Sequence, residues 1–238
     1  QAWSEVARRL AHEIKNPLTP IQLSAERLRH KYLSAMTNEA AETFDRLTRT
    51  IVQQVEAMKE MVDAFSDYAR TPEPTPRKLN LNQLVNDIAE LYRSDTRSVE
   101  ASLDENLLKI YADPDQLRQV LHNMLKNASE AHANGPVTID IATKNVSGGA
   151  GPLVQLSVLD NGTGIETELL ERLFEPYVSS KPKGTGLGLA IVKKIVEEHN
   201  GIVWADNPTA GGARIVMQLP ALVANENPQH QTDAAECK

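Results

Sequence analysis

The stretch Thr71-Pro-Glu-Pro-Thr-Pro-Arg-Lys78 places a proline at every second position from 72 to 76. Proline fixes the φ angle and has no amide hydrogen, so this alternation excludes a helix and favours an extended, semi-rigid spacer. Helical periodicity dominates the chain before this stretch, and mixed helix and strand patterns follow it. We therefore predict a first domain over 1–70, a linker over 71–78, a second domain over 79–220 and a disordered tail over 221–238.

The composition is that of a globular protein with room for one large or two modest domains. The chain has 238 residues, of which 41% are hydrophobic and 24% charged, and it has no apolar run near the roughly 18 residues of a membrane helix. The net charge of −7 disfavours a nucleic-acid partner. The lone Cys237 excludes an intramolecular disulfide. Because the chain opens at Gln1 without a leader, we expect a piece of a longer protein.

Two stretches before the spacer carry apolar residues at steps of three and four, which is the pattern of paired helices. The polar break at Ser34–Glu39 between them is long enough for an antiparallel turn. Because two helices alone bury too little, we predict that a second copy completes a four-helix bundle. Pro17 lies inside the first helix, where we expect a kink. The apolar positions are Trp3, Ala7, Leu10, Ile14, Leu18, Ile21, Ala25, Leu28 and Tyr32, then Phe44, Leu47, Ile51, Val55, Met58, Val62, Phe65 and Ala69.

The second domain is predicted to be α+β. Its elements are bounded by Gly, Pro and Asn, and Pro114 stands just inside the start of one helix. The predicted helices are Leu81–Tyr92, Asp115–His132 and Gly188–His199, and the predicted strands are Val137–Thr143, Leu153–Leu159, Ile202–Ala205 and Arg214–Leu219.

The first motif with chemical meaning is His12-Glu-Ile-Lys-Asn-Pro17. His12 lies about 200° around the helix from Ile14, so it points away from the apolar seam, and Asn16 follows one turn later. An ordinary surface histidine would fit the same pattern. A zinc-protease helix would not, because Asn16 occupies the position of the second histidine ligand.

Three more motifs lie in the second domain. Asn123 and Asn127 share one helix face, and their carboxamide oxygens suit Mg²⁺ that is held jointly with phosphates. Asp160-Asn-Gly-Thr-Gly164 follows an apolar strand and allows a ligand close to the backbone. Gly184-Thr-Gly-Leu-Gly188 runs into a helix whose first amides could bind phosphate, although it is neither a P-loop nor a dinucleotide fingerprint. Taken singly, each motif is also compatible with a solvated helix face or a glycine-rich turn.

The order of these motifs, with Phe174-Glu-Pro-Tyr177 between the last two, resembles the H, N, G1, F and G2 boxes of two-component sensor histidine kinases over about residues 1–220. The stretch Ala2–Leu28 is most similar to the NtrY subgroup of nitrogen-regulation kinases. The resemblance implies a helical dimerisation and phosphotransfer hairpin followed by a two-layer ATP-binding sandwich of the gyrase–chaperone–kinase type.

The resemblance also implies roles at the phosphotransfer end. His12 would accept the γ-phosphate of ATP and Glu13 would take the ring proton. Asn16 would orient a water that hydrolyses the aspartyl phosphate of a response regulator. That regulator would be the phosphotransfer partner, NtrX-like by the closer resemblance. The chain would be the cytoplasmic part of a membrane-anchored bacterial sensor, its anchor upstream of Gln1.

At the nucleotide end, the resemblance assigns Mg²⁺ to Asn127 and the phosphates to Asn123. Asp160 would accept a hydrogen bond from the adenine amine, and residues 166–185 would form a lid with Phe174 and Tyr177 as packing anchors. The remaining nucleotide contacts implied are Gly162, Gly164, Lys181 or Lys183, Gly184, Thr185, Gly186, Leu187 and Gly188.

Two other classes fit parts of the pattern. An ATPase of the same sandwich fold without a phosphohistidine would lack the His-Glu-x-x-Asn hairpin. A scaffold that merely dimerises would lack one of the boxes, whereas all five are present.

Overall fold

The computed structural model describes residues 2–70, 74–94, 97–131, 135–149, 151–179 and 184–222. The chain divides into two compact units. One comprises Gln1–Glu73 and Glu175–Ala190, and the other comprises Pro74–Phe174 and Ile191–Lys238. Each unit is described by itself below.

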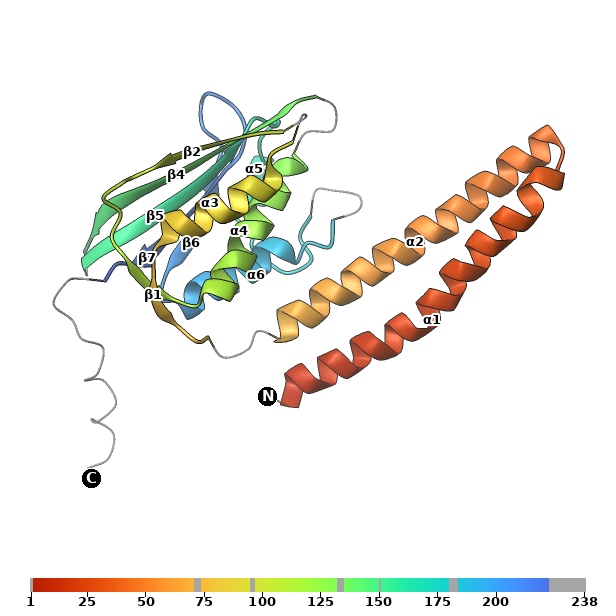
Figure 1. Ribbon diagram of the computed structural model, residues 1–238, viewed down its shortest axis with the longest axis horizontal. Helices are drawn as coiled ribbons and strands as arrows, with labels where there is room; N and C mark the ends of the chain where they lie inside the picture. Colours follow the sequence, from red (N-terminus) through yellow and green to blue (C-terminus); the bar gives the residue numbers. More distant parts are fainter. Residues whose placement is uncertain are drawn as a thin grey trace. The chain divides into compact units, whose positions relative to one another are not determined.

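The first unit is built on two long helices, α1 (Ala2–Tyr32) and α2 (Asn38–Arg70), joined by a short 3₁₀ turn at Leu33–Ala35. They run antiparallel (Figure 1), which confirms the predicted hairpin. The helix α1 continues through both Pro17 and Pro20. Figure 1 shows α1 changing direction along its length, as expected for a helix that contains proline.

The apolar stripe of the sequence divides into two faces in the hairpin, one buried and one exposed, as expected if two helices alone bury too little of it. Ala11, Leu18 and Ala25 recur every seven residues and are buried against α2. A second row stays exposed, because α2 alone covers only one side of α1. Its members are between 42% and 52% exposed: Leu10, Ile14, Ile21, Leu28 and Tyr32 on α1, and Leu47, Ile51, Met58 and Met61 on α2.

Polar side chains also join the two helices beside the buried residues. Lys15 of α1 pairs with Asp63 of α2, and Lys59 donates to Gln22 at 2.6 Å. Arg29 donates to Asp45 at 2.5 Å, and this guanidinium holds the pKa of the Asp45 carboxyl below its usual value. The seam is therefore held by side-chain hydrogen bonds as well as by packing.

The second unit contains a five-stranded sheet in the order β2-β4-β5-β7-β6. Only the β2–β4 pair is parallel. The strands are β2 (Arg97–Leu103), β4 (Val137–Gly148), β5 (Gly151–Asp160), β6 (Ile202–Asp206) and β7 (Arg214–Pro220), and a separate two-stranded sheet pairs β1 (Arg77–Leu79) with β3 (Ile110–Ala112).

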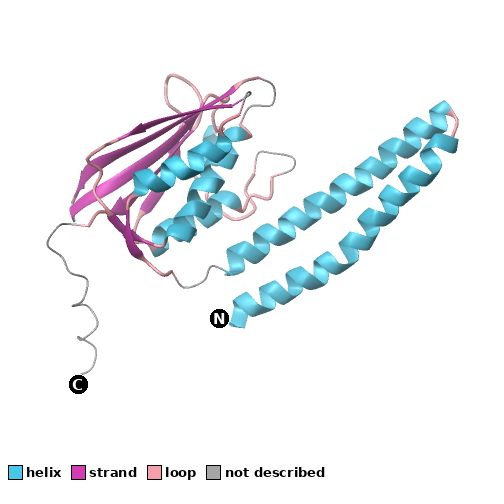
Figure 2. Ribbon diagram, viewed as in Figure 1, coloured by secondary structure: helices cyan, strands magenta, loops and turns pink. Residues whose placement is uncertain are grey.

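Helices cover one face of this sheet (Figure 2). They are α3 (Leu81–Tyr92), α4 (Pro114–Ser129) and α6 (Gly188–Glu198), with a short α5 (Thr167–Leu170) beyond β5. Their apolar sides pack on alternate residues of the central strands to form a fully buried core that includes Leu117, Leu121, Ile139, Leu156 and Ile195. The connection between the parallel strands β2 and β4 passes through β3 and α4, so α4 is the crossover helix of the sheet.

The predicted elements of this unit are largely confirmed, but several bounds differ and the short helix α5 was not predicted. The strands β1, β2 and β3 were not predicted, and Arg77 and Lys78 of the predicted spacer lie in β1. The helix α4 ends at Ser129, three residues early, where the Ser129 hydroxyl donates back to Leu125 O at 2.7 Å. Leu222 of the predicted tail donates to Lys109 O at 2.7 Å, and the rest of that tail, 223–238, lies outside the described residues.

Candidate functional site

The side chain of His12 lies exposed on α1, as its angle to the apolar seam predicts. Asn16, one turn later, is exposed as well. Glu13 accepts a hydrogen bond from Arg9 at 3.0 Å, and both side chains are largely exposed. Because an exposed pair of this kind contributes little free energy, the Glu13 carboxylate can exchange Arg9 for another partner at low cost.

Asn123 and Asn127 lie on α4, whose start is fixed by two local signals. Asp113 caps the helix by accepting from the amides of Asp115 and Gln116 at 2.8 and 3.1 Å, and Pro114 occupies its first position. The apolar side of α4 is buried against the sheet, and both asparagines are half-buried.

The Nδ2 atom of Asn123 is buried and has no hydrogen-bond partner among the described residues. A buried donor without a partner is costly, so such an atom marks a position where a ligand acceptor is expected. A phosphate oxygen is an acceptor of this kind. The unpaired amide of Asn123 therefore fits the predicted phosphate contact.

Asp160 ends β5 and is 8% exposed. Its Oδ1 accepts from the amides of Gly162 at 2.8 Å and Ala213 at 3.2 Å. Its Oδ2 accepts no hydrogen bond from the part of the chain that the structure describes. This second oxygen is available to a ligand donor such as an exocyclic amine. The contact from Ala213 was not predicted, because a backbone amide leaves no mark in the residue pattern.

Gly162 brings the Asp160 loop against the end of α4. A Cβ atom added at Gly162 would lie 2.9 Å from the Cβ of Ala131 and 3.0 Å from its carbonyl oxygen. Only glycine fits at this distance, so the sequence Asp-x-Gly allows the loop to pack closely beside the helix that carries Asn123 and Asn127. The structure thus brings together the two predicted nucleotide motifs of the second unit.

The segment Gly184–Gly188 leads directly into α6, as predicted, although it and His12 belong to the first unit and are described separately from Asp160. Gly186 has a φ of +65°, and Thr185 Oγ1 accepts from the amide of Leu187 at 3.4 Å. Leu187 is fully buried. Lys181 and Lys183 lie outside the described residues.

Phe174 is half-buried, but the expectation that Tyr177 also anchors the lid by packing is wrong. The Tyr177 side chain is 62% exposed. Its backbone has a φ of +67° at the third position of the turn Glu175–Val178, where Val178 N donates to Glu175 O at 3.4 Å. A turn of this type directs the side chain outward, and its third position favours glycine. Tyr177 contacts the Gly184–Gly188 segment through its backbone rather than its ring, because its amide donates to Gly186 O at 3.0 Å.

The donor set suits Mg²⁺ bound jointly with phosphates rather than a metal site made by protein alone. Within the described ranges, no group of three or more His, Cys, Asp or Glu side chains is placed to hold a metal ion. Mg²⁺ keeps several waters and binds readily through one protein oxygen plus substrate phosphates. The half-buried carboxamide of Asn127 fits that role.

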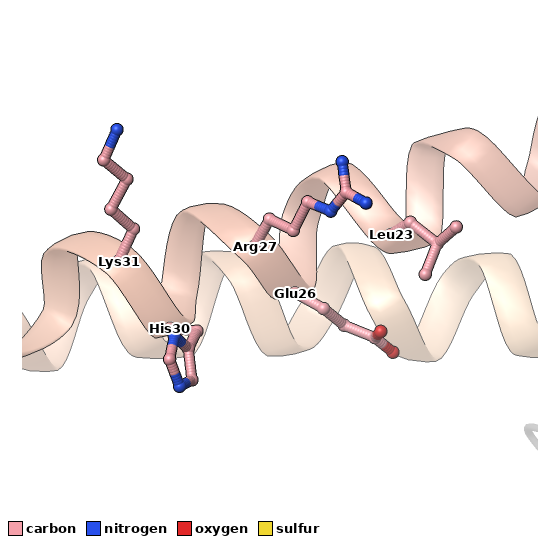
Figure 3. A pocket seen from close by; sticks show the side chains of 5 residues that line it. All are labelled: Leu23, Glu26, Arg27, His30 and Lys31. Atoms are coloured by element: carbon pink, nitrogen blue, oxygen red, sulfur yellow. The ribbon is translucent and has the colours of Figure 1, made fainter.

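A shallow hollow on α1 is lined by Leu23, Glu26, Arg27, His30 and Lys31 (Figure 3). The close-up shows the His30 and Lys31 side chains pointing to opposite sides of the helix. These groups do not converge on a common point, so the hollow lacks the geometry of a small-molecule site. None of the predicted site residues lines it.

Two domain families match different parts of the chain. Residues 2–74 match the His Kinase A (phospho-acceptor) domain, and residues 112–223 match the histidine kinase-, DNA gyrase B- and HSP90-like ATPases. The nitrogen regulation protein NtrY of Azorhizobium caulinodans is 42% identical over 98% of this chain. The chain spans only 30% of that relative's length. No helix among the described residues is long and apolar enough to cross a membrane.

Solved structures agree with these matches. The catalytic domain of histidine kinase ThkA is 32% identical with a TM-score of 0.54, over 61% of this chain and 95% of that chain. ThkA in complex with the response regulator protein TrrA is 26% identical with a TM-score of 0.65, over 92% of this chain and 61% of that chain. The chain therefore belongs to the sensor histidine kinases.

Proposed function

We propose that this chain carries the kinase activity of a two-component sensor, transferring the γ-phosphoryl group of ATP to His12 and from there to an aspartate of a response regulator. The observation that carries the proposal is the exposed imidazole of His12 on a helix whose second apolar row is also exposed. An exposed ring can reach a phosphoryl donor, and the apolar row supplies a surface for a second copy.

In the proposed reaction, a ring nitrogen of His12 forms a bond to the γ-phosphorus while the bond from that phosphorus to the bridging oxygen breaks, and ADP leaves. Glu13 takes the proton that the ring loses. Such a transfer depends mainly on positioning and on neutralising charge. Asn123 would donate to the phosphates, and Asp160 Oδ2 would accept from the adenine amine. Mg²⁺ on Asn127 would supply charge neutralisation.

The partner proposed is a response regulator, and two observations support it. The matched structure of ThkA contains the regulator TrrA, and the similarity to NtrY supports an NtrX-like regulator and a role in nitrogen regulation. We also propose phosphatase activity, because the exposed Asn16 carboxamide lies one turn from His12, where it could orient a water toward an aspartyl phosphate.

The test uses the full chain with Mg²⁺ and γ-labelled ATP, comparing wild type with His12→Gln. We expect wild type to gain label that survives alkali and is lost in acid, and His12→Gln to gain none. The matched control is His30→Gln, which removes another exposed histidine of α1 and should leave the label unchanged. Label that persists in His12→Gln would disprove the assignment of the phosphoacceptor.

A further inference from the structure

Asn207, which lies outside the five motifs, forms two hydrogen bonds to the loop that follows Asp160. Asn207 lies in the connection between β6 and β7. Its Oδ1 accepts from the amide of Ile165 at 2.8 Å, and its Nδ2 donates to the carbonyl of the same residue at 2.6 Å. The two ends of the carboxamide thus bind both backbone groups of one residue, directly after Gly164.

The same connection is in backbone contact with the other end of the loop. A Cβ atom added at Gly212 would lie 1.8 Å from Asp160 O, so only glycine can stand there. The carbonyl of the next residue, Ala213, accepts from Asp160 N at 3.0 Å. The residues between Asn207 and Ala213 therefore hold Asp160 at one end of the loop and Ile165 at the other.

A third contact fixes the loop from the opposite side. Asn161 accepts from the amide of Thr138 at 3.0 Å and donates to Pro136 O at 3.2 Å, which ties the loop to the start of β4. With Asn161 and the Asp160 backbone already fixed by the sheet, one further clamp among the described residues holds Ile165, directly after Gly164. That clamp is the carboxamide of Asn207.

We propose that Asn207 is a positioning residue for the nucleotide-binding loop, setting Gly164 and Ile165 at the distance from Asp160 that admits an adenine ring. This inference rests on the proposed function, since it concerns the same nucleotide. Asn207 itself is exposed, so its contribution is made through its two hydrogen bonds rather than through burial.

The chain offers a matched control for the loss of such a clamp. Asn145 of β4 accepts from the amide of Leu108 at 2.9 Å and donates to Asn106 O at 2.9 Å. This is the same side chain making the same kind of backbone contacts, and it is exposed too, but it holds the connection between β2 and β3. Asn145 also donates to Asp104 Oδ2 at 3.1 Å, so Asn145→Ala removes at least as many hydrogen bonds as Asn207→Ala without touching the Asp160 loop.

The experiment compares this chain as wild type, Asn207→Ala and Asn145→Ala by calorimetric titration with ADP and GDP, and by initial rates of autophosphorylation over a range of ATP concentrations. For Asn207→Ala we expect ADP affinity to fall about tenfold, the preference for ADP over GDP to shrink, and KM for ATP to rise about tenfold. The rate at saturating ATP should stay within about twofold. Asn207→Asp, which keeps only the acceptor for Ile165 N, should fall between wild type and Asn207→Ala.

Three results would overturn the inference, and the third is distinguishable from the first two because it is seen in wild type. If wild type binds ADP and Asn207→Ala binds it as tightly as Asn145→Ala does, Asn207 does not position the loop. A lowered saturating rate with unchanged KM would have the same meaning, since it reports a smaller folded fraction. If wild type itself binds neither nucleotide, the proposed nucleotide site fails and the inference fails with it.

Discussion

At the scale of single residues, the nucleotide motifs differ in how far they can be predicted from sequence. Asp160 accepts a hydrogen bond from the amide of Gly162, two residues later. A contact between residues so close in sequence can be predicted from a short motif. Asn207 binds a residue 42 positions away. No local pattern marks a contact of that range, so it was not predicted.

The carboxylate of Asp160 gives a direct test of adenine recognition. In Asp160→Asn the remaining oxygen can still accept from Gly162 and Ala213, but Nδ2 replaces the available Oδ2 and cannot accept from an amine. A hydrogen bond to a charged group contributes about 1.5–3 kcal/mol, so we expect ADP affinity to fall roughly 10- to 100-fold by calorimetry. Asp140→Asn, at an exposed acid of β4, is the control. Equal affinity in the two variants would remove adenine recognition from Asp160.

At the scale of elements, helices with clear periodicity were predicted well and short strands were not. The prediction for α3 matches its observed bounds, Leu81–Tyr92. The strands β1 and β3 have three residues each, too few for any alternation to show. In the hairpin, steps of three and four predicted which residues are apolar and helical, but they do not tell which partner, in the same chain or another, covers each residue.

The start of α4 is a junction of three elements. Beyond its capping bonds, Asp113 accepts from Thr75 N at 2.8 Å and Thr75 Oγ1 at 3.1 Å through Oδ2, and its own amide donates to His199 Nε2 at 3.0 Å. His199 follows α6, and its Nδ1 lies 2.8 Å from Ile195 O. Asp113 therefore joins Thr75 of the proline spacer to both α4 and α6.

We predict that this junction makes stability depend on pH. Burial opposes ionisation of Asp113, but the amides of Thr75, Gln116 and Asp115 outweigh it and lower the pKa of the carboxyl. A carboxyl whose pKa is lower in the folded state than in the unfolded state, where it is about 4, stabilises the folded protein at pH values above 4. This stabilisation is lost as the pH falls through the folded-state pKa. Asparagine can still cap α4 through Oδ1, but its Nδ2 cannot accept from Thr75 as Oδ2 does. Urea unfolding at pH 7 should therefore find Asp113→Asn less stable than wild type by about 1–2 kcal/mol, and this difference should narrow toward pH 3. The prediction would be contradicted if the loss in unfolding free energy were the same at both pH values. It would also be contradicted if the loss were no larger than that of Asp87→Asn, at an exposed position of α3.

At the scale of the whole molecule, the exposed apolar rows of α1 and α2 border each other. Ile21 and Leu28 of α1 border the same hollow as Ile51 of α2, so the rows of the two helices meet. A row of this length on a monomer is unusual and marks an interaction surface. It supports the predicted homodimer, in which a second hairpin would cover it.

Charges placed on this surface should therefore separate the two copies. Burying an Ile or Leu side chain contributes about 1.5–3 kcal/mol, so Ile21→Lys combined with Leu28→Lys should weaken the dimer at least about 100-fold. Sedimentation of the full chain would measure the change. Leu91→Lys, on α3 and 78% exposed, is the control. A dimer of unchanged affinity in the double variant would place the interface elsewhere.

The position of α4 as the crossover between β2 and β4 ties ligand binding to the integrity of the sheet. The only parallel neighbours of the sheet are joined through this helix, so the asparagines cannot detach without releasing the edge strand β2 from its connection. Segments linked in this way open as one cooperative unit. Any free energy that the proposed contacts of a nucleotide with Asn123 and Asn127 contribute would thereby stabilise the sheet as a whole, so this unit with and without nucleotide should differ in resistance to unfolding throughout rather than only around the ligand.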